Sequence, residues 1–247
     1  MIGDFPCHVE QRGDQLLVPS GTEALVRHYF ALDHPLTEIC ATFPDDAAMN
    51  AARDFAAGMR ILRQPAWECL ATFITSAMKQ VAHISQISHT LRRRYGQAHE
   101  GPDEPLYSYP TAERIAALDE SDLRACALGF RAKNLRNAAR MVASREVDLE
   151  AIATLDDDAA RAQLCRLPGV GEKVANCALL FGFGRLRAFP VDVWIDRILR
   201  HIYFPKKRNV TPKKLRDFSA KYFGPYAGYA QQYLFHHARL TWRRGKN

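Results

Sequence analysis

The sequence predicts a mainly α-helical protein with a small N-terminal β segment. From Thr22 onward, apolar residues recur at helical spacing, and capping residues or prolines stand at the starts of these segments. Before Thr22, residues 5–11 and 14–19 have the pattern of two short strands, turned at Arg12-Gly13. Two strands alone are marginally stable. We therefore interpret residues 1–21 as the remnant of an N-terminal β domain.

The composition is that of an ordinary globular protein. The 247 residues, 47% hydrophobic and 25% charged, are enough for one large domain or two small ones. A formal net charge of +7 favours a nucleic-acid partner only weakly. The six cysteines form no C-x-x-C pair, so we expect reduced core thiols and no zinc or iron–sulfur site. No apolar run approaches the roughly 20 residues of a membrane helix.

Each helical segment has its own start signal. Thr22 is expected to cap the first helix, and Asp45 a second one that ends near Met59. Pro65 opens an apolar helix, and residues 97–110 are rich in proline, glycine and acids and indicate a loop. Further helices are expected at residues 81–95, 111–118, 121–127, 132–144, 156–166, 172–183, 192–203 and 228–242.

Residues 167–171, Leu-Pro-Gly-Val-Gly, connect two of these helices. Gly169 and Gly171 allow a tight turn, after which backbone N–H groups point outward at the start of the next helix. A helix start carries partial positive charge and suits a phosphate. The unit is therefore predicted to be a helix–hairpin–helix that binds one DNA phosphate through its main chain.

Lys173 stands in the first turn of the helix after this hairpin, and Asp192 follows nineteen residues later. The positive helix end and partial burial both disfavour a protonated amine, and a neutral amine can attack C1′ of a deoxyribose whose base departs. Asp192 precedes an apolar helix as a natural N-cap, and its rigid carboxylate could stabilise positive charge on the sugar or shuttle protons. The alternatives are a solvated lysine that contacts phosphate and a purely structural cap.

Four further segments, with the hairpin, Lys173 and Asp192, resemble the 8-oxoguanine DNA glycosylases of the helix-hairpin-helix superfamily. The resemblance covers roughly residues 22 to 241 and implies a two-lobed helical fold. The segments are Met59–Pro65 with Glu68–Ile74, Leu128–Lys133, Gly224–Gln231 and Leu234-Phe235. The expected division is a β remnant at 1–21, lobe-associated helices at 22–62, a helical domain at 63–183 with the hairpin unit at 156–183, and closing helices at 184–247.

The resemblance also implies roles in the chemistry and in binding the base. Lys173 would be the nucleophile and Asp192 its electrostatic partner. Cys177 would line the base pocket, Phe235 would stack on the extruded base, and Gln231 would bond its Watson–Crick edge. Each of these three also has a structural interpretation, as a core thiol, a core aromatic and a surface amide.

Other residues would contact the duplex. Phe130 would fill the gap left by the base, and Arg131 would face the orphaned partner base. Amides near Gly169, Gly171 and Val174 would hold phosphate, as would Lys79. No cofactor is required, but a monovalent or calcium ion is possible at the hairpin, bound by the carbonyls of Cys165, Leu167 and Val170.

The sequence departs from the family at three places. Thr75–Gln80 replaces an asparagine run used to read the opposite cytosine, and Trp194 stands where a phosphate-binding histidine is usual. The family's Ser-Gly-Gln strand, whose glycine carbonyl distinguishes 8-oxoguanine from guanine, has no counterpart.

The expected function is a base-excision repair DNA glycosylase with AP lyase activity on 8-oxoguanine. It would act as a monomer on damaged double-stranded DNA with no membrane partner, in the bacterial cytoplasm at the nucleoid or in a eukaryotic nucleus. The alternatives are a glycosylase for alkylated or deaminated purines and an inactive DNA-binding protein.

Overall fold

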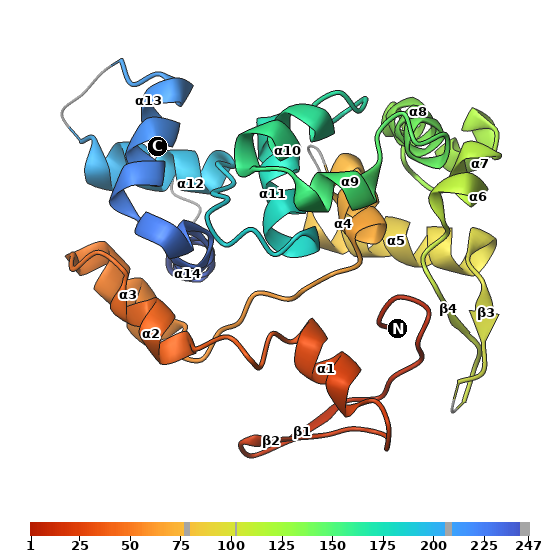
Figure 1. Cartoon of the computed structure of the whole chain (residues 1–247), viewed down its shortest axis with the longest axis horizontal. Coiled ribbons are helices and arrows are strands. Elements are labelled where there is room, and N and C mark those ends of the chain that lie inside the picture. Colours follow the sequence, from red (N-terminus) through yellow and green to blue (C-terminus); the bar gives the residue numbers. More distant parts are fainter. Residues whose placement is uncertain (77–79, 102, 206–208, 243–247) are drawn as a thin grey trace.

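A computed structural model describes residues 1–76, 80–101, 103–205 and 209–242, and it is mainly helical, as the sequence predicts (Figure 1). A π-helical turn, η1 (Leu199–Tyr203), extends the helix α12 (Val193–Ile198), and a 3-10 turn, η2 (Gly224–Tyr226), precedes the helix α14 (Ala227–Thr241). The helices are α1 (Glu23–Tyr29), α2 (Leu36–Ala41), α3 (Ala47–Phe55), α4 (Ala66–Thr75), α5 (Val81–Tyr95), α6 (Ala112–Ala116), α7 (Glu120–Arg124), α8 (Arg131–Ala143), α9 (Leu149–Thr154), α10 (Asp157–Leu164), α11 (Glu172–Gly182), α12 (Val193–Ile198), α13 (Pro212–Tyr222) and α14 (Ala227–Thr241).

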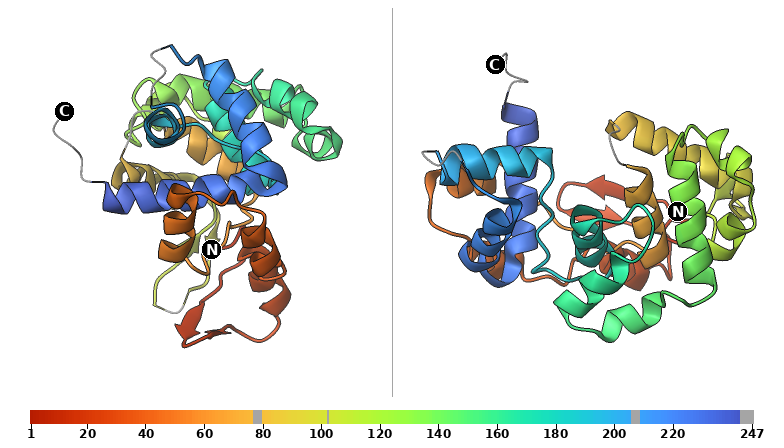
Figure 2. Two further views of the ribbon diagram at one scale, coloured as in Figure 1. Left: turned by 90° about the vertical axis from the view of Figure 1, so that its left-hand side faces the viewer. Right: turned by 90° about the horizontal axis from the view of Figure 1, so that it is seen from above.

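The helices form two lobes (Figures 1 and 2). The hairpin lobe holds α4 to α11, with α11 packed against α4. The α14 lobe combines α2 and α3 from early in the chain with α12 to α14 from its end, and α3 packs directly on α14. Two connectors, residues 56–65 and 183–192, run between the lobes. The hairpin lobe is thus an insertion within the α14 lobe.

Two small hairpins complete the fold. Strands β1 (Glu10–Arg12) and β2 (Gln15–Leu17) pair antiparallel, with Arg12 opposite Gln15, and lie next to α1 at the edge of the molecule (Figure 1). Gly13 in their turn has φ +61°, a conformation that glycine adopts without strain. Strands β3 (Ala98–His99) and β4 (Leu106–Tyr107) form a second hairpin inside the segment that the sequence indicated as loop.

Two of the expected caps differ in the structure. Thr22 precedes α1, but its hydroxyl donates to the carbonyl of Pro19 at 2.7 Å and caps no helix amide. The cap of α3 is Asp46 rather than Asp45, because Asp46 has the extended backbone from which a side chain reaches the helix start. Its Oδ1 accepts from the amides of Ala48 and Met49, both at 2.9 Å.

The start of α14 lies against the connector that leads from α11 to α12. Gly228 donates its N–H to the carbonyl of Leu186 at 2.8 Å. A Cβ at this position would lie 2.4 Å from Leu180 Cδ1 and 2.8 Å from the carbonyl oxygen of Ala188. Such close approach requires glycine, and it brings α14 against the end of α11.

Candidate active site

The hairpin has the geometry expected of a phosphate-binding turn. Gly169 has φ +80°, and Gly171 is the N-cap of α11 with no side-chain cap bond. The first bond within the helix runs from the amide of Ala175 to the carbonyl of Gly171 at 2.9 Å. The amides between these two residues, including that of Val174, therefore have no carbonyl partner within the helix. They are available to an anion at the helix start.

Asn134 of helix α8 packs against this turn. A Cβ on Gly169 would lie 3.0 Å from both Cβ and Nδ2 of Asn134. Any larger residue at position 169 would therefore collide with α8 and also require a positive φ. The turn is thus fixed by tertiary packing as well as by its glycines.

Lys173 and Asp192 line one cavity of about 1220 Å³ between the lobes. Asp192 is the N-cap of α12, as predicted, and its Oδ1 accepts from the amide of Ile195 at 2.8 Å. Phe235 of α14 lies on the same cavity wall. The structure therefore brings together three of the residues singled out in the sequence. Side chains from both lobes complete the wall, among them Phe73, Asn176, Trp194, Arg197, Arg216 and Arg239.

The Lys173 amine lies between an aromatic ring and a thiol. Its Nζ is 5.0 Å from the centroid of the Phe73 ring, within the range of a cation–π contact. Phe73 in turn stacks on Phe181 of α11, with centroids 5.7 Å apart and an angle of 18° between the planes. The side chain of Lys173 is half-buried by these contacts. Packing between α4 and α11 therefore fixes where the amine points.

Cys177 lies one turn along α11 from Lys173. Burial raises the pKa of its thiol to about 11; the ammonium of Lys173 opposes this shift, and the carboxylate of Asp192 adds to it. The charged groups on both sides of the cavity are thus close enough to affect the same sulfur.

Gln231 is buried, whereas one interpretation of the sequence placed it at the surface. It is 2% exposed, and its Oε1 accepts from Nε2 of Gln232 at 2.6 Å. It lies one turn before Phe235 on α14. This oxygen keeps a second lone pair, but Gln231 is not among the residues that line the cavity.

Phe130 and Arg131 lie at the start of α8 and differ sharply in exposure. Phe130 is 58% exposed, as a residue that fills a gap in the duplex must be. Arg131 is 5% exposed: its guanidinium lies over the Phe130 ring, 4.3 Å from the centroid, and Nη1 donates to the carbonyl of Leu128 at 3.3 Å. The structure therefore does not show Arg131 projecting outward. Its role opposite the orphaned base stays a prediction.

The sequence did not single out the arginines of the cavity wall. Arg216 forms an ion pair with Glu172 at 2.6 Å, which ties α13 to the hairpin helix. Arg197 lies 5.9 Å from the centroid of the Trp194 ring, and Trp194 lines the cavity. The sequence could have indicated this pair, because Trp194 and Arg197 have i, i+3 spacing and so lie on one face of a helix.

The remaining candidates concern ions and the loop after α4. Within the described residues, no group of three histidine, cysteine or acidic side chains is arranged for a metal ion. At the proposed ion site, the carbonyl of Leu167 accepts from the amide of Val170 at 3.0 Å and keeps a second lone pair. The carbonyls of Cys165, Leu167 and Val170 as ligands of a cation stay a prediction. Lys79 lies outside the described residues.

Two family models match consecutive parts of the chain. Residues 71–225 match the HhH-GPD superfamily of base excision DNA repair proteins. Residues 8–70 match the N-terminal domain of 8-oxoguanine DNA glycosylase. The second match includes the β1–β2 hairpin.

Individual relatives agree with these matches. A probable N-glycosylase/DNA lyase of Methanothermobacter thermautotrophicus is 32% identical, over 98% of this chain and 85% of that protein. The N-glycosylase/DNA lyase of Saccharomyces cerevisiae is 30% identical, over 86% of this chain and 66% of its own length.

A solved structure shares the whole architecture. The 8-oxoguanine glycosylase/lyase of Clostridium acetobutylicum, in complex with double-stranded DNA containing cytosine opposite 8-oxoguanine, superposes with a TM-score of 0.88. It is 32% identical, and the match covers 94% of this chain and 81% of that one. On these matches, the chain belongs to the HhH-GPD superfamily of base excision DNA repair proteins, as an 8-oxoguanine DNA glycosylase-like member.

Proposed function

We propose that this enzyme removes 8-oxoguanine opposite cytosine from double-stranded DNA and cleaves the strand through Lys173. It is a base excision repair glycosylase and DNA lyase, in line with its relatives. The observation that carries the residue assignment is one cavity wall shared by Lys173, Asp192 and Phe235.

The enzyme acts as a monomer on chromosomal DNA, in a bacterial nucleoid or a eukaryotic nucleus. Among the described residues, no helix has the length and apolarity needed to cross a bilayer.

In the first step, Lys173 gives up a proton, and its amine attacks C1′ of the extruded nucleotide. The bond from C1′ to the base breaks, and the base leaves with the electron pair and takes up a proton. The carboxylate of Asp192 stabilises positive charge that develops on the sugar. Because it is held at the helix start by the Ile195 amide, it does not need to reorganise as the charge develops.

In the second step, the amine nitrogen loses a proton and the C1′–O4′ bond breaks. O4′ leaves with the electron pair and takes up this proton, and a Schiff base remains between Lys173 and C1′. Loss of a proton from C2′ then expels the 3′ phosphate with its electron pair, and the strand is nicked. Water hydrolyses the Schiff base and regenerates the amine. Phe235 would stack on the base, Gln231 would bond its edge, and Cys177 would line the pocket beside the nucleophile.

The contacts with the duplex follow from the same proposal. The amides near Gly169, Gly171 and Val174 would bind a backbone phosphate. Phe130, already exposed at the start of α8, would occupy the space left by the base. Binding should weaken as salt rises, because phosphate contacts release counterions.

Borohydride reduction tests the nucleophile directly. With a duplex containing 8-oxoguanine opposite cytosine, the wild-type enzyme should be trapped as a covalent adduct, and Lys173→Gln should give none. Lys221→Gln is the matched control, because Lys221 is an exposed lysine on α13. A Lys173→Gln adduct as abundant as the wild-type one would exclude this nucleophile.

A panel of lesions tests the substrate. Release of 3-methyladenine with 8-oxoguanine left intact would replace the proposed lesion by an alkylated purine. Salt-sensitive binding without excision of any lesion would identify an inactive DNA-binding protein.

A further inference from the structure

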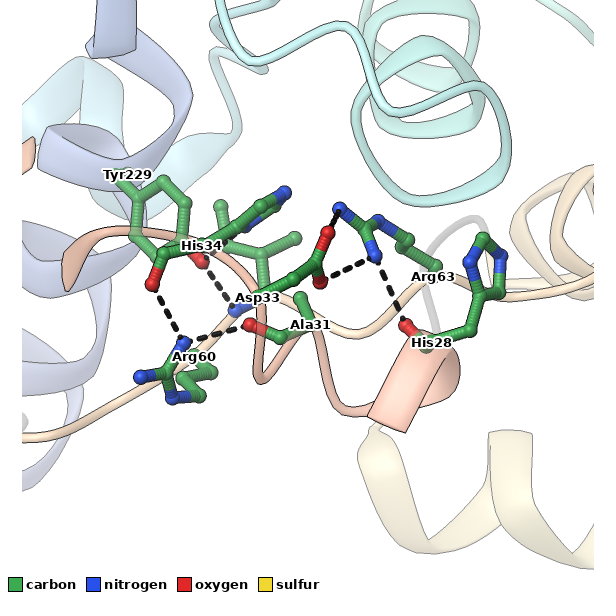
Figure 3. Close-up of polar contacts among 8 residues, drawn as sticks. His28, Ala31, Asp33, His34, Arg60, Arg63 and Tyr229 are labelled. Atoms are coloured by element: carbon green, nitrogen blue, oxygen red, sulfur yellow. Dashed lines mark hydrogen bonds and ion pairs between the residues drawn. The ribbon is translucent and has the colours of Figure 1, made fainter. Parts of the chain in front are cut away.

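The hydroxyl of Tyr229 connects α14 with two other parts of the chain. Tyr229 is fully buried, and its oxygen lies 2.8 Å from Nδ1 of His34 and 3.4 Å from the amide nitrogen of Ile61. His34 precedes α2, and Ile61 lies in the connector between α3 and α4. We call Tyr229, His34 and Ile61 the tyrosine junction (Figure 3).

Chemistry fixes the direction of one of these hydrogen bonds. The amide of Ile61 can only donate, so the Tyr229 oxygen accepts from it. The hydroxyl donates to Nδ1 of His34 when the ring proton is on Nε2, and it accepts from Nδ1 in the other neutral tautomer. Burial lowers the pKa of His34, and the cations Arg63 and Arg60 lower it further, against the opposing effect of Asp33. A neutral imidazole is therefore the favoured partner at neutral pH.

Two arginines of the connector hold the turn that carries His34 (Figure 3). Arg60 donates to the carbonyls of Ala31 at 2.6 Å and His34 at 3.1 Å. Arg63 donates two parallel bonds to the carboxylate of Asp33, at 2.7 and 2.9 Å. Ala31 is completely buried with φ +50°, an unusual conformation for alanine that the surrounding contacts must maintain. The turn and the connector therefore form one rigid support.

This support lies between the two halves of the active site. Tyr229 precedes Gln231 by two residues and Phe235 by six on α14. The connector leads into α4, which packs on α11 and contacts the Lys173 amine through Phe73. A second tyrosine of α14, Tyr233, donates to the carbonyl of Met59 at 3.0 Å in the same connector. These hydrogen bonds therefore fix the position of α14 along its axis relative to the lobe that carries Lys173.

We propose that Tyr229 and His34 are positioning residues that set the distance between the extruded base and the Lys173 amine. This inference rests on the proposed function. Excision requires the base to be held by α14 while the amine reaches C1′, so it depends on the relative position of the two lobes. Cleavage at a preformed abasic site requires only the amine and the sugar. Loss of the junction should therefore slow excision much more than lyase cleavage.

Tyr229→Phe tests this by removing one oxygen and leaving the ring. In single-turnover assays at neutral pH, excision of 8-oxoguanine should fall about tenfold, since displacement by 1 Å can cost as much as about 100-fold. Cleavage of a duplex with a preformed abasic site should stay within about twofold of wild type. His34→Ala should reproduce the defect, and His34→Asn should restore excision, because its amide oxygen can accept from the hydroxyl.

Tyr95→Phe is the matched control. The hydroxyl of Tyr95 donates to the carbonyl of Asp122 at 3.4 Å, a contact between α5 and α7 within the hairpin lobe. This variant should excise at the wild-type rate.

Thermal denaturation of every variant separates positioning from a general loss of stability. Equal excision by Tyr229→Phe and wild type would overturn the proposal. So would an equal fall of excision and lyase cleavage that follows a lower melting temperature. If the wild-type enzyme excises no lesion, the proposed function itself fails, and the inference fails with it.

Discussion

The carboxylate of Asp46 connects three elements of the α14 lobe, α3, η1 and α13. Its Oδ1 caps α3, and its Oδ2 accepts from the hydroxyls of Tyr203 at 3.0 Å and Tyr222 at 2.9 Å. These tyrosines come from η1 and α13, about 160 and 180 positions later in the chain. Asp46→Ala removes all of these hydrogen bonds at once.

The expected loss can be estimated from the contacts. An N-cap contributes about 1 kcal/mol. A hydrogen bond to a charged acceptor contributes about 1.5 to 3 kcal/mol, and we take the low end for Tyr203 and less for Tyr222, which is 38% exposed. Asp46→Ala should therefore lower the free energy of unfolding by about 3 kcal/mol. For a domain of this size that corresponds to a melting temperature roughly 6–12 °C lower.

Two further variants divide this effect. Asp46→Ser keeps a capping hydroxyl but cannot reach both tyrosines, so it should lose about 2 kcal/mol. Asp45→Ala is the neighbouring control: its side chain accepts from Nδ2 of Asn50 at an exposed site, and its removal should change stability by less than about 0.5 kcal/mol.

Urea denaturation followed by circular dichroism measures these differences. A loss below about 1 kcal/mol for Asp46→Ala would refute the reasoning. So would Asp45→Ala being as destabilising as Asp46→Ala.

Two other predictions concern titratable groups. Burial and the hydrogen bond to Asp46 raise the pKa of Tyr222 from 10 to about 12, so its stabilising contribution is complete below pH 10 and is lost as the pH rises towards 12. Urea denaturation at pH 9 and 11 should show lower stability at pH 11, and equal stability would contradict this. Burial raises the pKa of Cys177 to about 11, so its thiolate is rare at pH 8. Iodoacetamide should label Cys177 far more slowly than the partly exposed Cys7, as mass spectrometry of the peptides would show.

Most of the fold was predictable because its helices have strong periodic patterns. Helix α5 begins and ends at the predicted residues, and α11 ends one residue earlier than expected. The short helices α2 and α9 were not predicted, although the equally short α6 and α7 were. Which of Asp45 and Asp46 caps α3 depends on the backbone conformation of each residue. Two adjacent aspartates look the same in the sequence, so the sequence could not distinguish them.

The site was predictable where local sequence determines geometry. The hairpin glycines and the Asp192 cap follow from a few neighbouring residues, and the structure has both. Contacts between distant segments were not predictable in this way. His34 meets Tyr229 across 195 positions, and the burial of Arg131 depends on packing around the start of α8. No local pattern encodes either.

The insertion of one lobe within the other also has a consequence for biosynthesis. Helix α3 leaves the ribosome about 170 residues before α14, the helix on which it packs. At about 5 to 20 residues per second, this interval lasts roughly 10 to 35 s. The hairpin lobe can fold during that time from its own contiguous residues. During that time, the apolar face of α3 lacks the helix on which it packs in the folded chain.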